Sequence, residues 1–513
     1  MSQATTTTTA PSADLAALAR GGRINFFGFV LRLLARLPFL FIAGRIYGAE
    51  ALGRFAYAVL IVEFAAQLAT LGLKRGLAQQ LARTDKPHVH AVADALLVAA
   101  IGAAIAMTAL ALFPEAMFPN SEITGLEWAL PITVFALAWS DICLAALAYR
   151  HDVASTVRAR AIIEPWTISI AAFAWAFVST RDGLIIAYAL SMVAALIASI
   201  IPFLKSYGLP HDWRPDPGTL WQLARRNLPV AAADAVEWGS RRVDIAVLGL
   251  FFSPAIVGIY YVAQQVASLP SKLKTSFDPI LGPVISRNLA EGDKAAVAKQ
   301  VRQVGFWVIG AQGAVALALG IPGEAVMGLV GAGFVAGTAA LGFLLAAEVV
   351  AATAAVSEAA LIYCSRHRNM MISLAMILVE AGLAVGLILV MRRWGWPTMF
   401  QATGPALALM LSLGLASIAK SRLLAKILGH PVSGWRWPLI WAAAAATIVG
   451  QLAIMLPEWA EIIFGIPAIL TAFGAVLWVK GFGPEDRELF RMRKEDIEDL
   501  AIADPGPGAQ APR

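Results

Sequence analysis

The amino-acid sequence predicts an all-α polytopic membrane protein with about 14 transmembrane helices. Hydrophobic residues make up 59% of its 513 residues and charged residues only 14%, and the mean hydropathy is +0.71. Apolar blocks of about 20 residues, the length at which a helix crosses a bilayer, recur from end to end. Lysines and arginines lie mainly in the short loops between these blocks, which is typical of a membrane protein rather than of a large soluble core.

The predicted spans form two groups of six, separated by a polar, proline-rich break and followed by two more spans. The spans are expected at about residues 25–47, 55–73, 91–113, 128–149, 161–179, 184–204, 227–250, 256–285, 304–320, 336–363, 370–391, 399–418, 437–456 and 462–479. The domains follow as 1–23 (disordered cytoplasmic tail), 24–204 (first lobe), 205–226 (cytoplasmic linker with an amphipathic segment), 227–420 (second lobe), 421–480 (two extra helices) and 481–513 (cytoplasmic tail).

The distribution of basic residues predicts which side of the membrane each loop faces. Alternate loops are basic, beginning with the loop that carries Lys74 and Arg75, and the intervening loops are mostly neutral or acidic. The positive-inside rule then makes the basic loops and both termini cytoplasmic. Arg392 and Arg393 are the exception, because they lie on the expected outer side. The net charge of +6 therefore reflects loop topology and not nucleic-acid binding.

The sequence disfavours several classes of function. Its two cysteines, Cys143 and Cys364, lie in or beside predicted spans, so neither a disulfide framework nor a metal site is expected. We recognise no glycine-rich phosphate-binding loop and no Ser/His/Asp set, and no loop reaches the size of a catalytic domain. We therefore expect a protein that is not an enzyme and that holds no cofactor or metal.

One predicted span, Asn227–Leu250, carries charged residues in its middle. They are Asp234, Glu237, Arg241, Arg242 and Asp244. All but Arg242 are spaced by three or four residues, which predicts one helical face. A charge at the bilayer centre costs about 3 kcal/mol, so such residues normally face a partner or a wet cavity. Glu237 and Arg241 could instead neutralise each other as a structural pair at i and i+4.

The first span repeats this pattern. Asn25, Arg32 and Arg36 share one face of the predicted helix, and no acid lies one turn from either arginine. The two arginines therefore need a partner on another helix or an anionic ligand.

Two further spans present polar stripes. The second contains Glu63, and the eighth contains Gln265 and Lys272. Lys272 could face a cavity, or its long side chain could reach back to the cytoplasmic surface. Single acids in other spans are interpreted as satisfied residues of the helical bundle. They are Asp141, Glu164, Glu348, Glu358 and Glu380.

Two runs of sequence resemble a known family. Residues 35–83 pair a first span with a Gly-x-x-x-x-Gly turn and a second span that ends in Leu-Gly-Leu, and residues 241–270 contain Asp244 and a Val-Gly-Ile-Tyr-Tyr turn. Both runs are similar to polysaccharide flippases of the O-antigen (Wzx) type. These flippases belong to the multidrug/oligosaccharidyl-lipid/polysaccharide exporter superfamily, and the resemblance spans about residues 24–480.

The resemblance implies two six-helix lobes around a central cavity that work by alternating access in a bacterial cytoplasmic (inner) membrane. The implied substrate is an undecaprenyl-pyrophosphate-linked oligosaccharide, and polymerase or glycosyltransferase machinery is an implied partner. A pyrophosphate that crosses a low-dielectric layer needs fixed cations, for which arginine is well suited. The residues assigned to the cavity are Asn25, Arg32, Arg36, Arg241, Arg242, Gln265 and Lys272.

Such transport could use the membrane potential or an ion gradient. The potential, negative inside, favours outward movement of an anion by about 2.3 kcal/mol per charge per 100 mV. Coupling to H+ or Na+ would instead use a carboxylate that changes its protonation or its ion-pair partner. The candidates are Glu63, Asp234, Glu237 and Asp244.

Other functions compete with this one. A lipid-linked peptidoglycan-precursor flippase would have similar spans and a similar basic cavity. A cation-coupled multidrug exporter of the same superfamily would have an acidic, aromatic cavity. A polysaccharide polymerase or ligase would need a large periplasmic loop, which this sequence does not contain.

Overall fold

The chain folds into helices, with no strand in the part that the structure describes, and this confirms the all-α class. The structure is a computed structural model that describes residues 37–123, 125–275 and 278–487. Within these residues, nine helical segments are long and apolar enough to cross a membrane. Other expected spans are short, interrupted or charged; α7 (Glu164–Trp175), for example, follows a π-helical segment, Arg158–Ile163. The total of about 14 spans stays a prediction.

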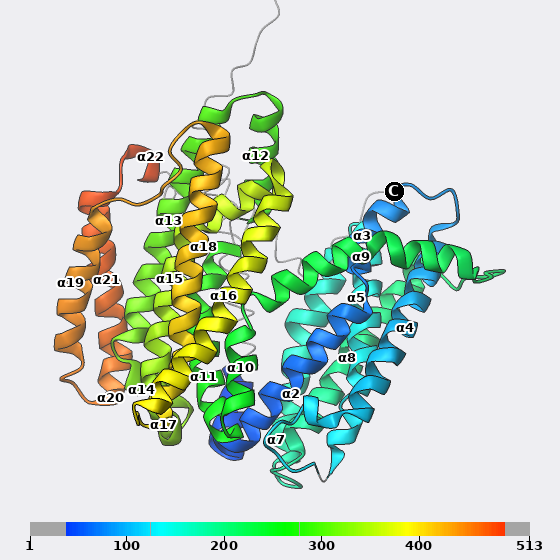
Figure 1. Cartoon of the computed structure of the whole chain (residues 1–513), viewed down its shortest axis with the longest axis horizontal. Helices are drawn as coiled ribbons and strands as arrows, with labels where there is room; N and C mark the ends of the chain where they lie inside the picture. Colours follow the sequence, from blue (N-terminus) through cyan, green and yellow to red (C-terminus); the bar gives the residue numbers. More distant parts are fainter. Residues whose placement is uncertain (1–36, 124, 276–277, 488–513) are drawn as a thin grey trace, which may run out of the picture.

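The helices gather in two bundles that meet at one end of the molecule and diverge toward the other (Figure 1). The first bundle contains α2 (Gly48–Ala69), α3 (Leu73–Leu81), α4 (His88–Leu112), α5 (Ile132–Tyr149), α6 (Val153–Val157), α7 and α8 (Gly183–Tyr207). The second contains α10 (Val243–Phe251), α11 (Pro254–Thr275), α12 (Asp278–Ala290), α13 (Lys294–Gly320), α14 (Gly323–Val330), α15 (Thr338–Cys364), α16 (Arg366–Arg393), α17 (Thr398–Gln401) and α18 (Gly404–Leu428).

The expected continuous helix over residues 227–250 is wrong. α9 (Pro217–Gly239) already includes the end of the expected linker, and the chain turns at residues 240–242 before α10 begins. The Ser240 hydroxyl donates to the carbonyl of Glu237 at 2.8 Å, and such local bonding competes with continuation of a helix. The charges spaced by three and four residues therefore do not share one face.

α9 crosses the first bundle near its diverging end (Figure 1). The helix is capped by Asp216, which accepts a hydrogen bond from the backbone N–H of Thr219 at 2.8 Å. Hydrogen bonds from Thr219 hold the pKa of Asp216 below its ordinary value. Leu223 packs in a hydrophobic cluster with side chains of α3, α4 and α5. Because α9 is attached to the first bundle and α10 belongs to the second, the turn between them joins the two bundles.

The backbones of the two bundles lie in close contact where α2 crosses α11. A Cβ atom added at Gly53 would lie 1.8 Å from the carbonyl oxygen of Pro254, and one added at Gly258 would lie 1.9 Å from that of Ala49. Only glycine fits at these two positions, because any side chain would overlap the backbone of the other helix. The contact fixes the meeting end of the bundles.

Two additional helices, α19 (Pro438–Ala453) and α21 (Ile466–Val476), pack on α13 at the outer side of the second bundle (Figure 1). The short α20 (Glu458–Ala460) lies between them in sequence, and α22 (Pro484–Arg487) follows. Asp486 is only 2% exposed. It accepts hydrogen bonds from Trp307 Nε1 at 2.9 Å and from Arg436 Nη1 at 2.7 Å. The chain beyond α21 is thus attached to the second bundle.

Candidate functional site

The turn between α9 and α10 presents Arg241 near the middle of a neighbouring long helix. Its Nη1 donates to Oε1 of Glu348, in α15, at 2.8 Å. The Arg241 side chain is 47% exposed and that of Glu348 is 15% exposed. Oε2 of Glu348 is buried with no hydrogen-bond partner among the described residues. One carboxylate oxygen of Glu348 is therefore left without a donor, and the half-exposed guanidinium of Arg241 is accessible to a ligand.

Arg242 links the second bundle to the first. Its Nη2 lies 3.7 Å from Oε2 of Glu63, in α2, and both side chains are more than a third exposed. The guanidinium lies over the ring of Trp238 at 4.4 Å, and that ring contacts Phe64 at 5.1 Å. A cation on an aromatic face is held in place without losing its charge. Arg242 therefore offers a positioned charge at the junction of the bundles.

The two acids of α9 belong to a different cluster. Arg75, in α3, pairs with Asp234 at 3.0 Å and with Glu237 at 2.9 Å. Asp234 is buried, whereas Glu237 is 67% exposed. The i, i+4 pairing of Glu237 with Arg241 that the sequence left open is not the pairing in the structure. This cluster attaches α9 to the first bundle.

Asp244 lies within the second bundle and is fully buried. It accepts hydrogen bonds from the Tyr260 hydroxyl at 2.7 Å and from Gln264 Nε2 at 3.1 Å. Glu380 of α16 is its charged neighbour and is also fully buried. Neither carboxylate oxygen of Glu380 has a hydrogen-bond partner among the described residues. No described lysine or arginine forms an ion pair with either carboxyl group, so protonation of one of them, or a shared small cation, would lower the cost of burying both.

A third set of charges, within the first bundle, is satisfied internally. Arg160 binds Asp141 and Glu164, and Lys74 binds Asp141 at 3.0 Å. Asp141 and Glu164 are thus paired residues of the helical bundle, as expected, and they leave no free charge for a ligand.

The remaining predicted site residues are only partly described. Asn25, Arg32 and Arg36 lie outside the described residues, and so does the side chain of Lys272. Gln265 lies in α11 and is partly buried, next to the Gln264 that binds Asp244. The structure thus brings Arg241 and Arg242 to one turn, whereas Asp234 and Glu237 pair with Arg75 and Asp244 binds Tyr260 and Gln264.

Sequence reasoning missed the partners of these residues. Glu348 and Glu380 were interpreted as satisfied acids of the bundle, and Arg75 only as a basic loop residue. Each pairing joins residues far apart in the sequence, so helical spacing gives no sign of it. One feature of the sequence does point to these acids. An acidic residue in an apolar span is energetically costly, and this applies to Glu348 and Glu380 as much as to Asp244.

Comparison with known sequences finds a family and a relative. The family described as "Polysaccharide biosynthesis protein" matches residues 42–308. A protein of Haloferax volcanii called "Probable flippase AglR" is 28% identical over 245 residues, which are 46% of this chain and 49% of that protein. The chain thus spans about half the length of the curated relative it matches.

Solved structures share the fold at low sequence identity. The lipid II flippase MurJ in an inward closed conformation is 12% identical, with a TM-score of 0.65 over 91% of this chain and 99% of MurJ. A multidrug resistance MATE family transporter of the MOP superfamily, in an inward-facing conformation, is 14% identical, with a TM-score of 0.60 over 78% of this chain and 98% of the transporter. These likenesses establish the fold.

Proposed function

This chain belongs to the polysaccharide biosynthesis protein family, and from that premise we propose that it is a flippase. The proposed substrate is an undecaprenyl-pyrophosphate-linked oligosaccharide, carried from the cytoplasmic to the periplasmic leaflet by alternating access for the synthesis of a surface polysaccharide. The relative called a probable flippase supports this proposal, and so does a fold shared with transporters. Both favour transport over catalysis.

The observation that carries the proposal is the pair Arg241 and Arg242 at a helix break between the bundles. Their side chains are 47% and 39% exposed, so several guanidinium donors remain accessible. Charges within a membrane-spanning bundle are costly unless they serve a partner or a ligand. The planar guanidinium fork matches phosphate oxygens, which makes a lipid pyrophosphate a suitable ligand.

Glu348 and Glu63 act in this proposal as internal counter-ions. Each neutralises its arginine while the site is empty, and an entering pyrophosphate displaces the carboxylates. Because Arg242 reaches Glu63 across the junction, binding of the anion changes a contact between the bundles. The membrane potential then favours outward movement by about 2.3 kcal/mol per charge per 100 mV.

The proposed orientation puts the diverging end of the molecule in the cytoplasm of a bacterial cell, with the chain in the inner membrane and both termini inside. The distribution of basic residues supports this orientation. Arg75, Arg225 and Arg287 lie in α3, α9 and α12, and these three helices lie toward the diverging end (Figure 1). Lipid-linked glycans are made on the cytoplasmic side in this proposal, so glycosyltransferase or polymerase machinery is a proposed partner.

A flipping assay tests the proposed function. Liposomes that contain the purified protein should move a fluorescent undecaprenyl-pyrophosphate-linked oligosaccharide to the leaflet where a membrane-impermeant reductant quenches it. The same assay with a lipid-linked peptidoglycan precursor distinguishes this function from that of a peptidoglycan-precursor flippase, which would move the precursor instead. The proposal would be contradicted if the protein, inserted in the liposomes in either orientation, moved neither of the two lipids.

A second candidate function is a cation-coupled multidrug exporter of the same superfamily. The buried carboxyl pair of Asp244 and Glu380 favours it, because such a pair can hold a proton or a small cation. Uptake of a cationic dye by the same liposomes, in the absence of lipid movement, would support the exporter.

The same pair predicts coupling to an H+ or Na+ gradient. The variant Glu380→Gln is expected to fold at least as stably as the unmodified protein, because it removes a buried, unpaired acid. With an H+ or Na+ gradient across the liposome membrane, the variant should transport its substrate about tenfold more slowly than the unmodified protein. That rate should equal the rate measured without a gradient. Glu115→Gln is the matched control, since Glu115 is exposed and lies outside the pair. Unchanged gradient dependence in Glu380→Gln would exclude this role.

A further inference from the structure

Where the two bundles meet, a side chain of the first bundle caps a helix of the second. Asn120 lies in the loop between α4 and α5, with φ at 59°. Its Nδ2 lies 3.1 Å from the carbonyl oxygen of Gly249 and 3.4 Å from those of Leu250 and Phe252. These carbonyls belong to the C-terminal end of α10, where the helix itself offers no N–H partners. Asn120 supplies the missing donor from the other bundle.

A second side chain repeats this arrangement. Arg45 lies in the π-helical segment Ala43–Tyr47 that precedes α2. Its Nε donates to the carbonyl of Leu329 at 3.0 Å, in the last turn of α14. A cation near the C-terminal end of a helix also interacts favourably with the helix dipole. Two donors of the first bundle thus bind the C-terminal carbonyls of two helices in the second.

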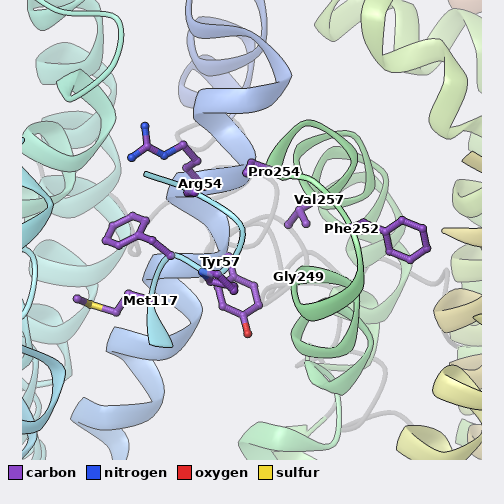
Figure 2. A pocket seen from close by; sticks show the side chains of 11 residues that line it. Arg54, Tyr57, Met117, Gly249, Phe252, Pro254 and Val257 are labelled. Atoms are coloured by element: carbon purple, nitrogen blue, oxygen red, sulfur yellow. The ribbon is translucent and has the colours of Figure 1, made fainter. Parts of the chain in front are cut away.

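The loop that carries Asn120 is itself fixed to α2. Arg54 forms an ion pair with the buried carboxylate of Glu127 and donates to the carbonyl of Glu122 at 2.9 Å. Met117, from the same loop, is buried, and it lines a small pocket with residues of both bundles. Figure 2 shows this pocket, with Arg54 and Met117 on one side and the helix that carries Val257 on the other. The loop therefore moves with the first bundle.

We propose that Asn120 and Arg45 form a releasable latch that keeps this end closed while the opposite end is open. The inference rests on the proposed alternating-access function. Both donors belong to one bundle and both acceptors to the other, so separation of the bundles breaks the two contacts together. Hydrogen bonds to carbonyl oxygens exchange with water at small net cost. The latch thus biases the equilibrium between the two states without locking it.

The test measures opening directly. In a background with Cys143→Ala and Cys364→Ala, the substitution Val257→Cys places one thiol at a position that is 1% exposed in the closed state. The labelling rate with a membrane-impermeant maleimide, applied to the face opposite the basic loops, reports how often this end opens. Asn120→Ala should raise the rate about fivefold, and Arg45→Gln by a similar factor. The double variant should exceed either single variant.

Ser121→Ala is the matched control. Ser121 lies in the same loop and lines the same pocket, and its side chain makes no hydrogen bond to the second bundle within the described residues. Its labelling rate should stay at the background value, with thermal unfolding midpoints compared for all variants. Unchanged labelling in the double variant, or an equal rise in the control, would overturn the latch. The readout needs no substrate, so a failed flipping assay with latch-dependent labelling would overturn only the proposed function.

Discussion

Replacing Arg241 and Glu348 together by glutamine is expected to give a stably folded protein whose transport of lipid-linked oligosaccharide falls by at least about tenfold. The double change removes both charges of the 2.8 Å pair, so neither partner is left as an unpaired charge. The pyrophosphate, however, loses one of its proposed cations. Flipping in liposomes and the thermal unfolding midpoint in detergent measure the two effects separately.

The single variants distinguish ligand binding from structural pairing. Arg241→Gln leaves Glu348, which is 15% exposed, without its cation. The expected cost is about 2 kcal/mol of folding free energy, less than for a fully buried pair because the arginine is half exposed. Glu348→Gln leaves the arginine free for an anion and should keep transport. Normal transport by the double variant would show that the ion pair of Arg241 and Glu348 has only a structural role.

The variant Gly258→Ala is expected to destabilise the protein by about 3 kcal/mol and to abolish transport. The added Cβ would lie 1.9 Å from the carbonyl oxygen of Ala49, a backbone atom that cannot turn away. α11 and α2 would have to separate at their crossing, so the closed end could not form as it is. The thermal unfolding midpoint and the flipping rate are the measurements.

Gly386→Ala provides the matched control for this prediction. Gly386 also lies inside a helix, α16, but a Cβ added there meets no atom within 4 Å. Alanine in a helix interior is expected to stabilise the protein by about 0.5–1 kcal/mol relative to glycine. Equal effects of the two substitutions would show that the crossing tolerates a side chain and is not a close contact.

Much of the fold could be predicted because membrane insertion imposes a strong length and hydropathy pattern. The helices α4, α8 and α16 lie close to the spans expected at about 91–113, 184–204 and 370–391. The turn after Gly239 could not be predicted in the same way. Gly-Ser is a weak helix breaker, and the ion pairs that hold α9 against the first bundle, from Arg75 to Asp234 and Glu237, join residues far apart in the sequence. Those contacts depend on tertiary structure.

The candidate site was predicted in kind but not in pairing. The cost of charge in a membrane singled out Arg241, Arg242 and Asp244, and each of them has an ion-pair or hydrogen-bond partner in the structure. It could not assign Glu348 to Arg241 or Glu380 to Asp244, because these acids lie on α15 and α16, far along the chain. A single sequence contains periodicity within a helix but not the contacts between helices.

The buried carboxylate of Asp486 bears on how the last two helices move. It ties the chain after α21 to Trp307, in α13, and to Arg436, just before α19. The hairpin of α19 and α21 therefore cannot swing independently and must travel with the second bundle in any rocking motion. In the proposed alternating-access cycle, these two helices would displace lipid each time the bundles rock. The viscosity of the surrounding bilayer would then act as a drag on turnover, even where no lipid is specifically bound.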